Sequence, residues 1–207
     1  MAYPNPHFDL APDEAWAIIQ ARSFGTLVGA GRHGGLRSAQ LPVTLDRDRG
    51  WLGCHLAANN PLNDALYASQ SGLLIVSAGD AYIQPSWYGL GPEQVPTWLH
   101  IHVEAAVDIH PMNAGQLTAH LVAISKRFEP DDESAWHPRQ MTRKRFDAMQ
   151  ANVRGYRLSV TDLRGQKKLG QNKPAPAIRG MTRRLRSTDG WSAQPIIEAL
   201  EALPANR

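Results

Sequence analysis

The chain of 207 residues is 43% hydrophobic and 20% charged, which is the balance of an ordinary globular domain rather than of a disordered or fibrous chain. No apolar run reaches the roughly 18 residues of a membrane-spanning helix, and the N-terminus lacks the basic and apolar regions of a signal peptide, so we expect a cytoplasmic protein and no membrane partner. The single cysteine, Cys54, excludes an internal disulfide and a cysteine-rich metal cluster, and we expect it to be a small buried hydrophobe.

The formal charge of +3 is unevenly distributed along the chain. Residues 139–186 contain fourteen Lys or Arg against only Asp147 and Asp162, so this segment carries +12 and the remainder −9. Such asymmetry favours an anionic partner. Nucleic acid, a cofactor phosphate and the acidic part of a neighbouring subunit all fit this description.

The N-terminal half is predicted to begin with a helix and to continue as a meander. Pro12 suits the first turn of a helix, and the spacing of apolar residues continues to Arg22. Short β-prone runs then alternate with turn-like segments, which is typical of antiparallel strands. We expect strands at 24–31, 36–45, 51–57 and 72–79, and a short helix at 59–69.

The C-terminal half begins with the clearest strand, because apolar and polar residues alternate from Leu99 to Ile109. A helix with one buried stripe that includes Leu117 and Phe128 is expected at 112–128. Further elements are expected as a basic helix around Phe146, Met149 and Val153, a strand at 156–163 and a tail helix at 194–203. Together these elements predict a mainly β chain with inserted helices (α+β) that forms a small antiparallel barrel. We expect a barrel domain at 1–186 and a helical tail at 187–207.

The glycines Gly29, Gly31 and Gly34 match the GxGxxG pattern of dinucleotide-binding turns. That chemistry needs a helix to begin at the glycines, so that its N-terminal NH groups face the pyrophosphate. Here another β-prone run follows instead. The pattern therefore predicts a hairpin turn, and any nucleotide must be bound elsewhere.

Two stretches are rich in groups that bind ligands. Residues 79–88, "GDAYIQPSWY", gather aromatic and polar side chains, which would either cap a core edge or form a wall for a flat ligand. Residues 167–174, "KKLGQNKP", offer cations and amides to a phosphate, unless they are only a solvated basic loop.

Two other groups of residues are weaker candidates for a functional site. His100 and His102 lie on one strand face, but no further ligands complete a metal site, and we expect none. Ser86 lacks the surroundings of a hydrolase nucleophile.

Five motifs in order, "HF" at 7–8, "GCHLAANNP" at 53–61, "GDAYIQPSWY" at 79–88, "VPTW" at 95–98 and "KKLGQNKP" at 167–174, resemble the PaiB family of flavin-binding split-barrel proteins. The resemblance extends to about Arg186. The chain departs from the family pattern at Ala58 and Asn59, at Leu99 and His100, and at Gly170, where the family usually has serine.

The resemblance implies a six-stranded antiparallel split barrel that dimerises and binds FMN in grooves between the subunits. The residues expected to bind the cofactor are His55, Asn60, Tyr82, Gln84, Ser86, Trp87, Tyr88, Thr97, Trp98, Lys168, Gln171 and Asn172. Among them, Lys168, Gln171 and Asn172 are predicted to hold the phosphate.

Three functions remain open at this point. The first is a flavin-dependent redox or flavin-sensing protein in which FMN supplies the chemistry. Whether such a protein is an enzyme, namely an FMN-dependent oxidoreductase, is left open. The second is a negative transcriptional regulator, as family members are commonly described, with weak and sequence-independent DNA binding through the basic segment. The third is a haem-binding split barrel, although none of the eight histidines stands out as the axial ligand.

Overall fold

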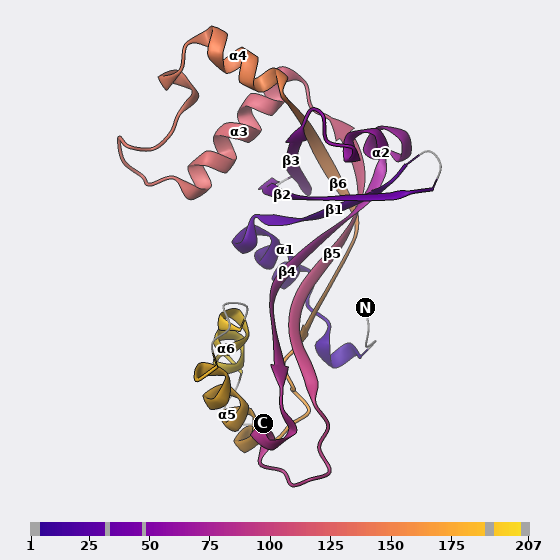
Figure 1. The fold of residues 1–207 in the computed structure, drawn as a ribbon, viewed down its shortest axis with the longest axis vertical. Coiled ribbons are helices and arrows are strands. Elements are labelled where there is room, and N and C mark those ends of the chain that lie inside the picture. The colour runs from indigo at the N-terminus through magenta and orange to yellow at the C-terminus, as the bar shows by residue number, and fades with distance from the viewer. Residues whose placement is uncertain (1–4, 32–33, 47–48, 189–192, 204–207) are drawn as a thin grey trace. The chain divides into compact units, whose positions relative to one another are not determined.

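The computed structural model describes residues 5–31, 34–46, 49–188 and 193–203 (Figure 1). Within these residues the strands are β1 (Phe24–Ala30), β2 (Leu36–Asp46), β3 (Trp51–Ala57), β4 (Ser71–Ile83), β5 (Thr97–Pro111) and β6 (Val153–Lys168). The α-helices are α1 (Pro12–Arg22), α2 (Leu62–Ser69), α3 (Ala114–Phe128), α4 (Arg143–Ala151), α5 (Ala175–Arg186) and α6 (Gln194–Glu201). Short 3-10 helices form at η1 (Pro6–Phe8), η2 (Pro85–Tyr88) and η3 (Pro138–Gln140).

The strands close into a barrel in the order β1-β2-β3-β6-β5-β4. β1 pairs antiparallel with both β2 and β4, and β3 pairs antiparallel with β2 and β6. The hairpin between β1 and β2 contains the glycine pattern, where Gly31 donates to the Gly35 carbonyl at 2.9 Å. The predicted hairpin is therefore confirmed, and so is the six-stranded antiparallel fold with inserted helices.

The chain divides into two compact units built from interleaved segments. Unit 1 comprises the described residues of Met1–Ala15, Ser77–Val103 and Arg164–Arg207, and unit 2 comprises Trp16–Val76 and Glu104–Leu163. β4, β5 and β6 contribute residues to both units. The boundary expected between residues 186 and 187 stays a prediction.

Each unit has its own buried residues. In unit 2 they come mainly from alternate positions of the strands, since alternate side chains of a strand point to the same face. Fully buried examples are Leu27, Leu41, Leu52, Cys54, Leu74 and Leu158. In unit 1, α5 and α6 lie side by side and bury one face each (Figure 1). Its fully buried residues include Ile83, Leu99, Leu169, Met181 and Ile196.

The predicted element types are confirmed, but several boundaries are wrong. β4 runs on to Ile83, so the first half of the stretch 79–88 is strand, and the chain turns only at η2. Val153 was expected in the basic helix, yet it begins β6 because it pairs with Ala57 of β3. β6 continues through Lys168. Phe128 was expected in a buried stripe but is 63% exposed.

Candidate functional site

An exposed pair of aromatic rings lies in unit 1 at the neighbouring strands β4 and β5. Tyr82 and Trp98 meet edge to face, with ring centroids 5.7 Å apart and an interplanar angle of 64°. Tyr82 is 45% and Trp98 is 56% exposed, whereas rings of this size usually bury most of their surface. The pair therefore presents apolar, flat surface on which a planar ligand can pack.

Polar groups adjoin this pair. Trp98, His100 and His102 occupy alternate positions of β5, and the two imidazole centroids are 5.2 Å apart. The Lys168 ammonium, at the end of β6, donates to the Thr97 hydroxyl at 2.9 Å. Burial lowers the pKa of His100, and the charges of His102 and Lys168 lower it further, which places Lys168 within electrostatic range of this imidazole. Burial also lowers the pKa of Lys168 itself.

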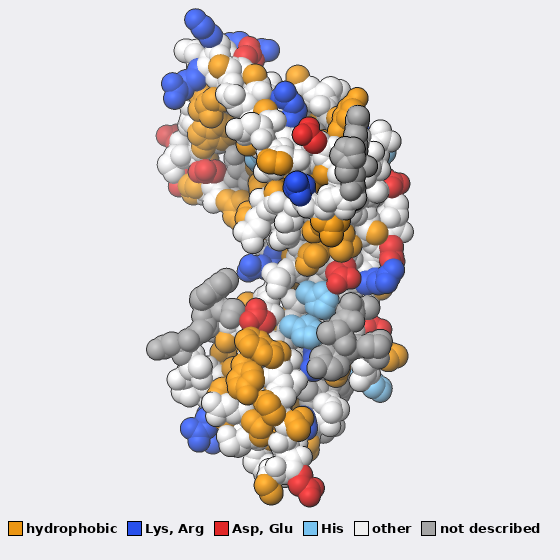
Figure 2. All heavy atoms as spheres, turned by 45° about the vertical axis from the view of Figure 1, so that its right-hand side comes forward, with side chains coloured by type: hydrophobic (Ala, Val, Ile, Leu, Met, Phe, Trp, Pro, Cys, Tyr) orange, Lys and Arg blue, Asp and Glu red, His pale blue; other side chains and the backbone are white. Residues whose placement is uncertain are grey.

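The space-filling view shows adjoining histidine side chains with hydrophobic side chains next to them (Figure 2). A surface of this composition offers donors, cations and aromatic carbon within a small area. It suits an anionic ligand that has a flat ring system.

The stretch 167–174 is a fixed turn rather than a free loop. Leu169 is fully buried, and Gly170 has φ +74°, a left-handed conformation that glycine adopts without the cost a side chain would bring. The Gln171 amide oxygen accepts from the Leu169 NH at 2.8 Å, and its amide nitrogen donates to the Lys167 carbonyl at 2.5 Å. Gln171 thus fastens the turn that follows Lys168. Asn172 is exposed.

The other two lysines of this stretch have partners of their own. Lys167 pairs with Glu14 at 3.1 Å, and this hydrogen bond is the main cause that lowers the Glu14 pKa. Lys173 donates to the Gln94 amide oxygen at 2.7 Å and lies over the Tyr88 ring, 4.7 Å from its centroid. Lys168 is the lysine of this turn that contacts the start of β5, where it donates to the hydroxyl of Thr97, the residue before Trp98.

The residues of η2 divide between surface and core. Gln84 and Ser86 are exposed. Tyr88 is only 4% exposed, and burial raises the pKa of its hydroxyl. The Trp87 carbonyl lies against α5, because a Cβ at Gly180 would approach it to 2.5 Å. The core-edge interpretation of the stretch 79–88 therefore applies to Tyr88, while the ligand wall, for which Tyr82 is exposed, stays a prediction.

The two remaining predicted residues lie in unit 2. His55 Nδ1 is 2.9 Å from His120 Nε2, and His120 Nδ1 is 3.0 Å from the Thr44 hydroxyl. The Asn60 side chain accepts from the Leu62 NH at 2.9 Å, so it shapes the start of α2. His120 was missed in the sequence, although it follows Leu117 by three residues and so lies on the buried side of α3.

Comparison with known proteins identifies the class. Residues 1–162 match the family model described as "Putative FMN-binding domain", and the chain belongs to that family. More particularly, it is a PaiB homologue. It is 24% identical over 193 residues to the "Protease synthase and sporulation protein PAI 2" of Bacillus subtilis (strain 168), an alignment that covers 91% of each chain. The resemblance seen in the five motifs is confirmed.

Two solved structures share the fold. One is the FAD and heme binding protein from Mycobacterium smegmatis, with a TM-score of 0.61 and 14% identity over 88% of this chain and 80% of that one. The other is a flavocytochrome from Azotobacter vinelandii, with a TM-score of 0.57 and 16% identity over 76% of this chain and 67% of that one. Both confirm the split-barrel fold.

The family membership supports FMN as the cofactor, and the chemistry of the exposed face in unit 1 fits this group. An isoalloxazine ring needs flat apolar contact, which Tyr82 and Trp98 can provide, while the phosphate needs a cation, which Lys168 can provide. Among the described residues, no cluster of His, Cys, Asp or Glu could hold a metal ion. No helix in the described part of the chain is long and apolar enough to cross a membrane.

Proposed function

We propose that the chain is a flavoprotein that holds FMN in unit 1 where β4 ends, β5 begins and β6 ends, and that it acts in flavin-dependent redox chemistry or flavin sensing. The observation that supports this most is the exposed aromatic pair of Tyr82 and Trp98, next in sequence to the hydroxyl that accepts from Lys168. FMN would supply the electron or hydride transfer, and the protein would supply position and polarity.

In this proposal the residues have different tasks. Tyr82 and Trp98 contact the ring system, while Lys168 and Thr97 donate to the phosphate. Gln171 acts indirectly, because its amide fastens the turn that positions Lys168. Asn172, Gln84 and Ser86 are exposed and stay candidates for direct contact. His55 and Asn60 stay predictions, with local hydrogen bonds described above.

The phosphate assignment is tested by titrating FMN and riboflavin into wild type and the variant Lys168→Met, with flavin fluorescence as the readout. A charge-assisted hydrogen bond contributes about 1.5–3 kcal/mol, so the variant should bind FMN roughly ten- to a hundredfold more weakly and riboflavin unchanged. Lys144→Met, which removes an exposed lysine of α4, is the matched control. An equal loss of FMN and riboflavin, or no loss of FMN, would show that Lys168 does not hold the phosphate.

We also propose a homodimer, because the resemblance implies a groove built from two subunits. The exposed Val95 and Trp98 would be covered in such an assembly. Light scattering at micromolar concentration should give twice the mass of the chain. A monomer that binds FMN would contradict the homodimer and would leave the proposed flavin site unaffected.

A regulatory role is a second candidate, and the basic surface of α5 favours it. Arg179, Arg183, Arg184 and Arg186 are exposed on this helix, whose other face is buried. Side chains of this kind contact phosphates without reading bases. Binding to duplex DNA should be weak, independent of sequence and strongly reduced between 50 and 200 mM salt. A footprint at one operator that survives physiological salt would contradict this expectation.

Haem is an alternative cofactor, since one of the two structural relatives is a FAD and heme binding protein. The absorption spectrum of the purified protein separates the two, because flavin bands differ from a haem Soret band. The cytoplasmic location expected from the sequence likewise stays a prediction.

A further inference from the structure

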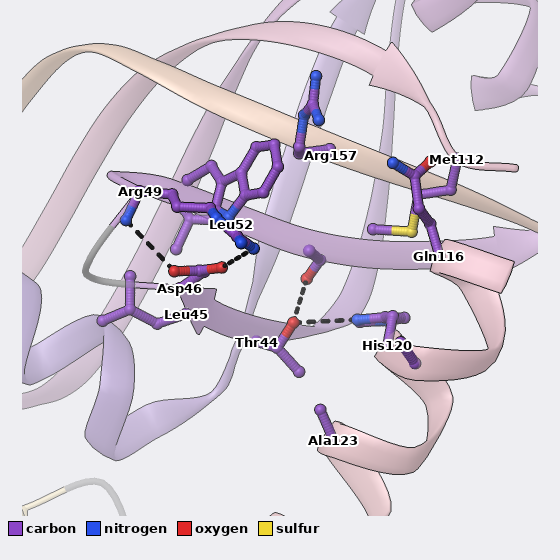
Figure 3. A pocket seen from close by; sticks show the side chains of 13 residues that line it. Thr44, Leu45, Asp46, Arg49, Leu52, Met112, Gln116, His120, Ala123 and Arg157 are labelled. Carbon is purple, nitrogen blue, oxygen red and sulfur yellow. Dashed lines mark hydrogen bonds and ion pairs between the residues drawn. The ribbon is translucent and has the colours of Figure 1, made fainter.

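Unit 2 contains a cavity of about 520 Å³ between α3 and the strands β2, β3 and β6 (Figure 3). None of its lining residues belongs to the proposed FMN face. Its apolar wall includes Leu52 and Met112, and the small side chains of Ala119 and Ala123 on α3 leave room beside it. A cavity of this size accommodates a small organic molecule.

Most of the charged groups at this cavity are already satisfied. The Asp46 carboxylate accepts from Arg49 Nη1 at 3.2 Å (Figure 3). It also accepts from the Trp51 side chain. The Trp51 hydrogen bond is the main cause that lowers the Asp46 pKa, so this carboxylate is ionised and balances Arg49. Burial and the neighbouring His55 lower the pKa of His120 to about 4, so this imidazole is neutral at pH 7.

Arg157 is the remaining charge. Its guanidinium carbon lies 3.9 Å from the centroid of a Trp51 ring, a distance at which a cation and an aromatic face attract each other. Its Nε is buried and makes no hydrogen bond within the described residues. A buried NH without an acceptor costs free energy, and for a charged donor the cost is larger. The planar fork of a guanidinium suits a carboxylate, which accepts two parallel hydrogen bonds.

We propose that this cavity binds a small aromatic carboxylate, with the carboxylate on the Arg157 guanidinium and the ring against Trp51 and the apolar wall. A single negative charge matches the cavity, because Arg49 and Asp46 balance each other and Arg157 adds one positive charge. A flat ring matches it because the indole of Trp51 is itself flat and the alanines of α3 give space. This site is independent of the proposed flavin site.

The test compares 1-naphthoate with its neutral analogue 1-naphthamide by isothermal titration calorimetry on the full chain. Wild type should bind naphthoate at least tenfold more tightly than naphthamide, because only the anion forms a charge-assisted hydrogen bond. Arg157→Gln should bind both compounds equally. Ala123→Phe should weaken both at least tenfold, because the ring fills the cavity without changing its charge. Arg139→Gln, which removes an exposed arginine, is the matched control.

Circular dichroism of each variant checks that it is folded, and a parallel FMN titration should give the same affinity in all of them. The proposal is overturned if wild type binds neither compound, if Arg157→Gln keeps the preference for naphthoate, or if Ala123→Phe binds as wild type does. Displacement of naphthoate by FMN would assign the cavity to the flavin and would also overturn it. Loss of FMN binding by Lys168→Met, with naphthoate binding intact, would support the separation of the two sites.

Discussion

At the scale of single residues, the hydrogen bonds that link Thr44 to His120 and His120 to His55 depend on a glycine, Gly53. A Cβ at Gly53 would lie 2.6 Å from the Thr44 hydroxyl and 2.9 Å from His120 Nδ1, so any larger residue would push these groups apart. The glycine lets α3 bring a buried histidine against the barrel. The sequence indicated His55 as a candidate but not its partner, because His55 and His120 are 65 positions apart along the chain.

The buried His120 predicts that stability depends on pH. Above about pH 6.5 the imidazole is neutral in both the folded and the unfolded chain, and its full contribution is present. Between about pH 6.5 and 4 the unfolded chain binds a proton that the folded chain does not, so the free energy of unfolding falls as pH falls. Because the His120 pKa is about 4 in the folded chain and 6.5 in the unfolded chain, the free energy of unfolding falls by on the order of 3 kcal/mol. Burial lowers the pKa of His55 as well, which acts in the same direction.

Urea unfolding at pH 7.5 and pH 4.0 measures this effect in wild type and in His120→Gln. The loss of stability between the two pH values should be about 3 kcal/mol smaller in the variant. His110→Gln, which removes an exposed histidine, is the control. Equal losses in wild type and His120→Gln would mean that His120 is not buried in its neutral form.

At the scale of elements, periodicity predicted the strands and most of the α-helices, but not α5 and not where the elements end. Alternation identified β5 and helical spacing identified α3, because each pattern depends only on which face is buried. The ends of the elements depend on pairing partners. Val153, for example, belongs to β6 because it pairs with Ala57 of β3. The fixed turn after Lys168 was not predicted, since neither the Gln171 hydrogen bonds nor the burial of Leu169 is visible in composition.

Two helical glycines give a prediction about packing. Alanine is favoured over glycine inside a helix by about 1 kcal/mol. At Gly115 in α3 a Cβ would meet Asn113 at an ordinary 3.5 Å, so Gly115→Ala should stabilise the protein by about 0.5–1 kcal/mol. At Gly180 in α5 it would meet the Trp87 carbonyl at 2.5 Å, so Gly180→Ala should destabilise by about 1–3 kcal/mol despite the helix propensity.

Denaturant unfolding of the two variants beside wild type checks these opposite signs. A stabilising Gly180→Ala would show that α5 does not pack closely on η2. The same chemical change is made in both variants, in the first turn of α3 for Gly115 and in the interior of α5 for Gly180.

At the scale of the whole molecule, the order of five motifs identified the family and thereby the barrel, which composition alone could not do. The division into two units with interleaved segments was not foreseen, because it depends on strands long enough to contribute residues to both. Of the predicted cofactor residues, His55 and Asn60 belong to unit 2 and the others to unit 1, where Tyr82 contacts Trp98 and Lys168 contacts Thr97. The sequence predicted which types of residue the site contains better than which of these residues contact one another.

The measurement that tests the central claim most directly is an FMN titration of wild type and the double variant Tyr82→Ala/Trp98→Ala, followed by flavin fluorescence. Wild type should bind FMN saturably, and the double variant should bind at least tenfold more weakly, because stacking on two rings contributes roughly 0.5–1.5 kcal/mol each beyond the apolar area that they bury. Tyr67→Ala, which removes an aromatic ring of unit 2 that is 70% exposed, should bind as wild type does. If wild type does not bind FMN saturably, or if the double variant binds it equally well, the aromatic pair is not the flavin site.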